Sequence, residues 1–316
     1  MPGRGTALLR VSTHLPTLIA MAAIALLSGI VGADAQELEP RAYSAAPVGT
    51  NFLIGGYART TGDVSLVPSI PLTDVRASIN TGLLAYSRTF DLLGRTASAG
   101  FLLPYTSALV SGNVGEQGRQ VTRNGPGDLR LRVTANLYGN PAVTPAEFAQ
   151  RQPTTTIGSA LTIIAPTGDY NPQHLVNISA NRWALKPEIG LEQPIGNWFV
   201  NAAAGAWLFT DNTNFFGGNV RGQNPLWNFE LDAGYLFRPG LWLAASATYY
   251  TGGETRVNGV GSHDALANSR YGLTLSVPLA PPGLSAKAAW STGLTGRLGG
   301  HFDIIAFSLQ YRWFDR

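Results

Sequence analysis

The chain of 316 residues contains no cysteine, and only 13% of its residues are charged. A typical soluble domain carries about 25% charged residues, so this composition does not favour a water-exposed globular protein. The absence of cysteine fits an exported protein that makes no use of disulfides. A mean hydropathy of +0.05 is also too low for a bundle of membrane helices, each of which needs about 20 consecutive apolar residues.

A single long apolar run is present, and it lies at the N-terminus, over residues 15–31. Arg4 and Arg10 precede it, and the small-residue motif Ala33-Asp34-Ala35 follows it. This order is typical of a secretory signal peptide, and the run is at the short limit for a transmembrane anchor. We therefore predict a signal peptide over residues 1–35, cleaved after Ala35. The formal net charge of +3 forms no basic patch, and it gives no support to a nucleic-acid partner.

Polar and apolar residues alternate with a period of two along most of the remaining chain. Within residues 128–137, 182–192, 227–237, 241–249, 271–277 and 305–313, the odd positions hold no charged side chain, whereas the even positions hold most of the charge. A helix would rotate such a pattern every 3.6 residues, so the period predicts β-strands with one apolar face.

Alternation alone does not tell whether the apolar face meets a protein core or lipid. Strand length favours lipid, because the expected strands run about 9–12 residues, the length that crosses a bilayer at a tilt. Twelve strands are expected, over residues 50–59, 74–90, 95–111, 127–138, 154–167, 182–193, 198–210, 226–237, 241–250, 269–277, 284–292 and 303–313. The fold class predicted is all-β, a closed antiparallel transmembrane β-barrel.

The lengths of the links between these strands also indicate an outer-membrane barrel. Short links alternate with long ones that are rich in glycine and asparagine, as periplasmic turns alternate with outer loops in such barrels. The exception is the link over residues 139–153, where residues 145–150 are expected to form a helical turn. We accordingly expect residues 36–49 to be a periplasmic N-terminal segment and residues 50–316 to be the barrel, in the outer membrane of a Gram-negative bacterium.

Aromatic side chains are expected to form one girdle at each membrane interface. One set falls at strand ends on the side of the short turns and comprises Trp198, Phe199, Phe237, Trp242, Trp313 and Phe314. The other set lies towards the opposite ends and comprises Trp183, Trp207, Phe209, Trp227 and Trp290.

Several local sequences resemble one known family. They are LEPRAYS at 38–44, APVG at 46–49, KPEIGL at 186–191, FTDN at 209–212, RPGLW at 238–242, TYYTGG at 248–253, NSR at 268–270, STG at 291–293 and QYRW at 310–313. Together they resemble the transporter-like outer-membrane family named for the MetA pathway of phenol degradation, across nearly all of residues 37–313. The resemblance implies an outer-membrane barrel that passes small aromatic or other hydrophobic compounds.

Motifs for chemistry are nearly absent. Ser262-His263-Asp264 has the residue types of a catalytic triad, but consecutive residues do not reach the required geometry. His301 and Asp303 share one strand face and offer a weak hydrolytic pair. No cluster has the spacing of a metal site, so we predict no enzyme, no cofactor and no metal.

The interior of the barrel is the predicted functional region. Twelve strands spaced by about 4.8 Å and tilted by about 40° give a backbone radius of roughly 12 Å, which leaves a narrow passage between side chains. The charged residues expected to line it are Asp128, Arg130, Arg132, Arg182, Lys186, Glu188, Glu192, Glu230, Asp232, Arg270 and Arg312. Six positive and five negative charges predict no strong ion preference, and they are expected to form cross-strand ion pairs or a polar path for solutes. Pro187 has no N–H to donate, so a bulge is expected there.

Three functions fit this pattern. The first is an outer-membrane channel for small solutes, hydrophobic and aromatic compounds among them. The second is a structural or surface-interaction barrel with a plugged lumen, and the third is a barrel enzyme. The expected partners are outer-membrane lipid, a small-molecule solute and the barrel-assembly machinery.

Overall fold

The computed structural model describes residues 39–65, 72–114, 117–295 and 299–315. The predicted signal peptide over residues 1–35 lies outside these ranges. Among the described residues, no helix is long and apolar enough to cross a membrane.

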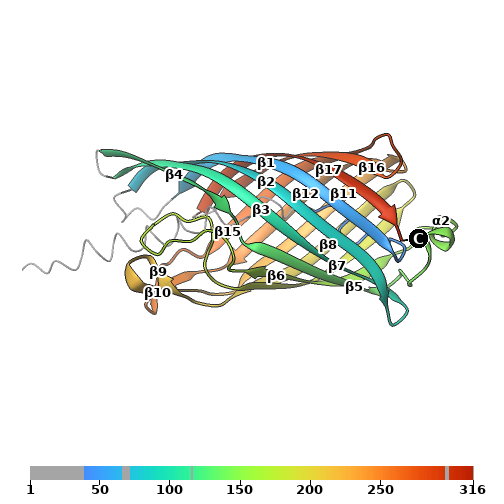
Figure 1. Cartoon of the computed structure of the whole chain (residues 1–316), viewed down its shortest axis with the longest axis horizontal. Helices are drawn as coiled ribbons and strands as arrows, with labels where there is room; N and C mark the ends of the chain where they lie inside the picture. The colour runs from blue at the N-terminus through green and yellow to red at the C-terminus, as the bar shows by residue number, and fades with distance from the viewer. Residues whose placement is uncertain (1–38, 66–71, 115–116, 296–298, 316) are drawn as a thin grey trace, which may run out of the picture.

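Twelve strand positions form one closed antiparallel barrel (Figure 1), as the sequence predicts. Neighbouring strands in the chain are neighbours in the sheet, and β1 closes the barrel by pairing with both β2 and β17. The strands of the barrel are β1 (Thr50–Ser65), β2 (Leu72–Leu92), β3 (Arg95–Val114), β4 (Gln117–Pro126), β5 (Leu129–Tyr138), β6 (Thr156–Ala165), β7 (Ala184–Ile195), β8 (Trp198–Phe209), β11 (Leu226–Arg238), β12 (Leu241–Gly252), β15 (Leu266–Pro278), β16 (Leu284–Thr295) and β17 (Gly299–Phe314).

β4 and β5 together occupy one position in the barrel wall. β4 pairs with the second half of β3, from Tyr105 onward, and β5 pairs with its first half, up to Leu102. The expected fourth strand is therefore longer than predicted, because most of the expected loop over residues 112–126 continues the wall as β4. This extension places β1 to β4 beyond the rest of the barrel at one end (Figure 1).

Residues at alternate positions along each strand lie on opposite faces of the barrel wall, as the period-two sequence pattern predicts. Along β7, Lys186, Glu188 and Glu192 are buried, whereas Pro187 and Ile189 are exposed on the outside. Along β11, Asp232 is 2% exposed and its neighbour Leu231 is 56% exposed. The apolar side chains thus cover the outer surface and the polar ones face the lumen, the reverse of a soluble domain.

The two ends of the barrel differ. The C-terminus and the helix α2 (Pro145–Ala149) lie at the end that carries the short turns (Figure 1). We call it the short-turn end and its opposite the long-loop end. The helical turn expected at residues 145–150 is confirmed, and Thr144 and Glu147 cap it reciprocally. The pKa of the exposed Glu147 carboxyl is lowered, because it accepts hydrogen bonds from the backbone and hydroxyl of Thr144.

Two of the loops at the long-loop end contain a second, small sheet that the sequence does not predict. It has the strand order β14-β13-β10-β9. Its elements are β9 (Asn212–Phe215), η2 (Phe216–Gly218), β10 (Asn219–Gln223), β13 (Thr255–Val257) and β14 (Val260–Gly261). The loops between β8 and β11 and between β12 and β15 are therefore joined to each other.

The bulge expected at Pro187 is absent. β7 keeps one register with β6 across Pro187, and its register with β8 is the same on both sides of this residue. Instead, Lys186 and Pro187 have no paired residues on β8, so no hydrogen bond from Pro187 is needed there. The proline ring lies on the outer face of the barrel.

Candidate functional site

The lumen has a charged centre around Glu188 on β7. The Glu188 carboxylate lies 2.9 Å from Lys186 Nζ and 3.2 Å from Arg132 Nη2, and it accepts a hydrogen bond of 2.6 Å from the Tyr43 hydroxyl. Lys186 and Glu188 are nearly fully buried, and Lys186 Nζ also lies 5.2 Å from the centre of the Trp207 ring. Three of the predicted lumen charges therefore form one network across β5 and β7.

The N-terminal segment over residues 39–44 lies inside the barrel rather than below it. Ser44 donates a hydrogen bond of 2.6 Å to Glu192, and the Arg41 guanidinium lies 3.6 Å from the same carboxylate. Glu39 lies 3.7 Å from Arg132, and its backbone N–H donates to Glu230 at 3.2 Å. The segment that we expected in the periplasm thus contacts the inner faces of β5, β7 and β11 along these residues.

Two glycines leave the space that Tyr43 occupies. A Cβ atom at Gly190 would lie 2.0 Å from the Tyr43 ring, and one at Gly158 would lie 2.8 Å from it. These two glycines face each other across β6 and β7. The inner wall therefore forms a socket for Tyr43, which is 4% exposed.

Glu230 and Asp232, on the inner face of β11, have no such network. Among the described residues, neither carboxylate is in an ion pair with a basic side chain. Asp232 Oδ1 is buried and has no hydrogen-bond partner. This part of the wall carries negative charge without a matched cation.

The other predicted lumen residues lie towards the two ends. Asp128 accepts hydrogen bonds from Ser179 and from the backbone of Gly168 and Ala180, so it anchors the loop over residues 166–183. Arg182 bonds to Gln223 and lies 4.3 Å from the centre of the Phe209 ring.

Arg270, Arg130 and Arg312 complete the predicted set. Arg270 donates to Ser291 and to the Phe302 carbonyl. Arg130 is half-buried on β5, and Arg312 is exposed near the short-turn end, 5.6 Å from the Phe314 ring centre. The structure therefore brings together Arg132, Lys186 and Glu188, places Glu192, Glu230 and Asp232 nearby along the inner wall, and holds the rest apart.

Four of the aromatics expected in the girdles point into the barrel instead. Phe199 and Trp242 are buried and meet edge to face with ring centres 6.0 Å apart. The ammonium group of Lys186 lies over the Trp207 ring, and the guanidinium group of Arg182 lies over the Phe209 ring. The prediction was wrong for these four because it used position along the strand and ignored which face each position occupies.

The outward-facing aromatics fit the girdles better. The exposed members on the outer surface are Trp183, Trp198, Trp227, Phe237 and Trp290.

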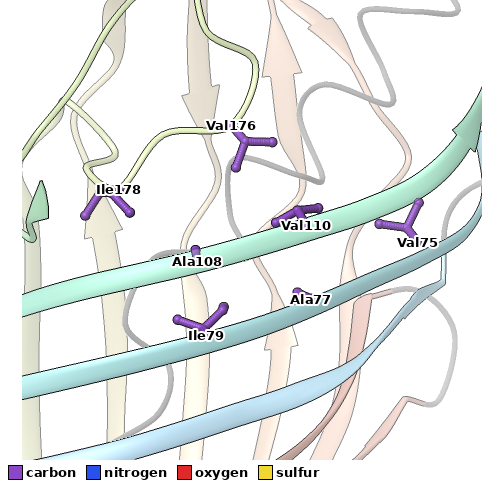
Figure 2. Packing of buried hydrophobic residues seen from close by; sticks show 7 residues of the cluster. All are labelled: Val75, Ala77, Ile79, Ala108, Val110, Val176 and Ile178. Atoms are coloured by element: carbon purple, nitrogen blue, oxygen red, sulfur yellow. The ribbon is translucent and has the colours of Figure 1, made fainter. Parts of the chain in front are cut away.

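The loop that Asp128 anchors narrows the long-loop end. Val176 and Ile178 of this loop pack against inward-facing residues of β2 and β3, as Figure 2 shows. The wall residues of this apolar cluster are Val75, Ala77, Ile79, Ala108 and Val110. Beside it, Phe215 and Val257 of the small sheet are also buried and contact Leu175.

Of the remaining candidates for chemistry, Ser262 and Asp264 have structural partners. Ser262 and Asp264 both contact Thr255, whose hydroxyl lies 2.6 Å from Asp264, while the side chain of His263 is 89% exposed. His301 and Asp303 are exposed on β17. No three His, Asp or Glu side chains gather as metal ligands in the part of the chain that the structure describes.

In the small sheet, burial lowers the pKa of Arg221 to about 10, and the nearby Asp264 carboxylate partly offsets this shift.

The sequence contained signals for some of the features that the prediction missed. Trp242 has the same parity as Ser246 and Thr248, and Phe199 has the same parity as Asn201, so strand parity would have placed both rings inside. The lumen position of Tyr43 had no such signal, because the contact joins residues 145 positions apart.

Three solved structures of outer-membrane proteins are similar to this chain to different degrees. The COG4313 outer membrane channel from Pseudomonas putida F1 superposes with a TM-score of 0.75 at 23% identity, over 88% of this chain and 100% of that one. The transport unit of the autotransporter AIDA-I from Escherichia coli gives 0.48 at 10% identity, over 95% and 97%. The TodX monoaromatic hydrocarbon channel deltaS2 mutant gives 0.47 at 11% identity, over 86% and 91%.

None of the curated proteins matches the sequence. The model of the family described as "Putative MetA-pathway of phenol degradation" matches residues 55–305, which is most of the chain. The resemblance drawn from the sequence is therefore confirmed, and the chain belongs to this family.

Proposed function

We propose that the protein is an outer-membrane channel through which small solutes, hydrophobic and aromatic compounds among them, cross by facilitated diffusion. The observation that carries this proposal is the inversion of the barrel, with Leu231 and its apolar neighbours outside and Asp232 and the other charged residues inside. Such a wall separates a lipid-facing surface from a polar interior, as in outer-membrane channels. The family description, which refers to phenol degradation, supports an aromatic solute.

The outer membrane of a Gram-negative bacterium is the proposed location, reached after removal of residues 1–35 and insertion by the barrel-assembly machinery. Outer-membrane lipid would then contact the exposed apolar side chains. Cell fractionation and heat-modifiable gel migration test this location. A mature protein that fractionates as soluble, and migrates alike before and after boiling, would contradict it.

The proposed solute path passes the charged inner wall. Its lining would be the set expected from the sequence, namely Asp128, Arg130, Arg132, Arg182, Lys186, Glu188, Glu192, Glu230, Asp232, Arg270 and Arg312. Because Glu188 and Glu192 are paired with cations, these residues support a rigid wall with no strong ion preference.

The N-terminal segment is the proposed internal constriction of this path. Tyr43, Ser44 and Arg41 fix it to β7 through hydrogen bonds and an ion pair. The loop around Val176 and Ile178 is a second constriction, at the long-loop end.

Permeation through reconstituted protein tests the proposed function. Vesicles that contain the mature protein should swell in a small neutral solute, and protein-free vesicles prepared in parallel should not. The same vesicles allow uptake of phenol and of a sugar of similar size to be compared.

The second candidate is a structural barrel whose lumen stays closed. The burial of Tyr43 in its socket and the apolar contacts of Val176 favour it. If the protein is folded, as judged by heat-modifiable migration, and its vesicles remain impermeable to every solute, this candidate is supported over the channel.

An enzyme is the least supported of the three functions, because Ser262 and Asp264 are engaged with Thr255 rather than with His263.

A further inference from the structure

One region of the inner wall bears polar atoms that the protein itself does not use. It consists of Asn228, Glu230 and Asp232 on β11, together with Ser246 and Thr248 on β12. In the register, Glu230 lies opposite Thr248, and Asp232 lies opposite Ser246. We call these five residues the acidic patch.

The acidic patch has buried polar atoms without partners. Asn228 Oδ1, Asp232 Oδ1 and Thr248 Oγ1 have no hydrogen-bond partner in the part of the chain that the structure describes. Asn228 is 1% exposed, and Asp232 and Thr248 are each 2% exposed. Native proteins rarely leave such atoms unsatisfied, and an exception calls for an absent ligand, ion or water.

The patch also lacks a counter-charge. Neither Glu230 nor Asp232 is in an ion pair with a described residue, and Glu230 accepts the backbone N–H of Glu39. Of the nearby cations, Arg132 pairs with Glu188 and Arg41 with Glu192, while Lys287 Nζ lies 5.8 Å from the centre of the Trp242 ring.

Small residues and two aromatic rings surround the patch on the wall. Ala203 on β8 lies opposite Glu230, and Gly234 and Ala244 face each other next to Asp232. The buried pair of Phe199 and Trp242 lies at this side, where Phe199 occupies the space that a side chain at Gly234 would fill. The wall thus offers hydrogen-bond acceptors and two carboxyl groups, and Arg41 and Lys287 already lie over the Phe199 and Trp242 rings.

From this arrangement we infer that the acidic patch binds the protonated amine of a small organic cation that enters the lumen. An ammonium group supplies three N–H donors and one positive charge, which match the neighbouring carboxyl groups of Glu230 and Asp232 on one face of β11. The rings of Phe199 and Trp242 already face cations of the protein, with the Arg41 guanidinium 5.1 Å and Lys287 Nζ 5.8 Å from the respective ring centres, so the carboxylates carry the preference for a cationic solute. This inference rests on the proposed channel function and gives its solute class.

Three aromatic compounds of similar size test whether the patch recognises the positive charge, a hydroxyl group or the aromatic ring. They are benzylammonium, benzyl alcohol and benzoate, each added to the protein in a planar bilayer while the current is recorded. We expect benzylammonium to interrupt the current at concentrations at least tenfold lower than the other two. The double variant Glu230→Gln, Asp232→Asn should raise the blocking concentration of benzylammonium at least tenfold.

A matched control removes a carboxylate from the outside of the barrel. Asp303 is exposed on β17, so Asp303→Asn should leave the block by benzylammonium unchanged. Equal block by benzyl alcohol, or full block in the double variant, would overturn the inference and leave the channel function intact.

Binding in detergent separates the inference from the channel proposal. Calorimetric titration of the folded protein with benzylammonium requires no conduction. Binding that the double variant abolishes would support the site even in a protein that carries no current. Absence of binding to the wild type would overturn the inference, whatever the current shows.

Discussion

The two sides of the inner wall satisfy their polar residues in different ways. On β7, the Glu188 carboxylate has Lys186, Arg132 and Tyr43 as partners. On β11, Asp232 is as deeply buried but has a free oxygen atom and no cation. The β7 side therefore meets its charges with the protein's own groups, whereas the β11 side, which accepts only the backbone N–H of Glu39 from the N-terminal segment, keeps unsatisfied polar atoms. One barrel thus combines a self-bound wall and an open wall.

The largest expected difference between the two walls is in stability. Glu188→Ala leaves the buried ammonium of Lys186 and the guanidinium of Arg132 without their carboxylate, which should cost about 3 kcal/mol of folding free energy. Asp232→Asn removes no ion pair and should cost well under about 1 kcal/mol, like most substitutions that break no buried network. Urea titrations of both variants in lipid vesicles measure the two values. Equal losses would remove the distinction between the walls.

The second prediction separates the inner face of the open wall from its lipid face. Leu231→Arg places a cation on the outer surface and should destabilise the inserted barrel by roughly 2–4 kcal/mol if the residue lies near the bilayer midplane. Glu230→Arg, one residue away on the lumen face, should have a smaller effect because water and Asp232 are available to it. If both variants insert with the same free energy, the assignment of the two faces is wrong.

The third prediction tests the socket of the self-bound wall. In Gly190→Val, the new side chain would occupy the position of the Tyr43 ring, at a cost of about 1–3 kcal/mol for overpacking. Displacement of the N-terminal segment should relieve this strain, so the conductance should rise. Gly55→Val is the control, because a Cβ at Gly55 meets no atom within 4 Å. An unchanged conductance in Gly190→Val would mean that the segment does not narrow the path.

The smallest expected effect depends on pH and lies outside the lumen. Asp315 follows β17 and accepts hydrogen bonds from Asn51 and Arg88, which hold the pKa of its carboxyl below the ordinary value. Its contribution to stability is therefore full above the ordinary carboxyl pKa and is lost as the pH falls through the lowered pKa. Asp315→Asn should reduce the unfolding midpoint at pH 7 and have less effect at pH 2. A loss of equal size at both pH values would contradict this assignment.

The sequence predicted the barrel well because its wall obeys a local rule. Each strand alternates apolar and polar residues, so Asp128–Tyr138 or the stretch around Glu230 can be read without knowledge of its neighbours. The same rule placed Lys186, Glu188 and Asp232 on the lumen face.

What the sequence did not predict depends on contacts between distant segments. The seating of Tyr43 requires Gly158 and Gly190 on adjacent strands, and the small sheet joins β10 to β13 across two loops. The alternation of faces along each strand does predict that the rings of Phe199 and Trp242 point inward. We instead assigned them to the membrane interface because they are aromatic and lie near strand ends. Neither kind of feature changes the local pattern that identifies a strand.

The most direct test of the account asks whether ions pass along the inner wall. Because the chain has no native cysteine, a single cysteine can be placed at Ser246, on the lumen face of β12, or at its outward-facing neighbour Ala245. We expect a bulky, charged thiol reagent to lower the current through Ser246→Cys in a planar bilayer and to leave the current through Ala245→Cys unchanged. An equal response of the two variants, or a folded protein that carries no current in either, would contradict the claim that the lumen is a solute path.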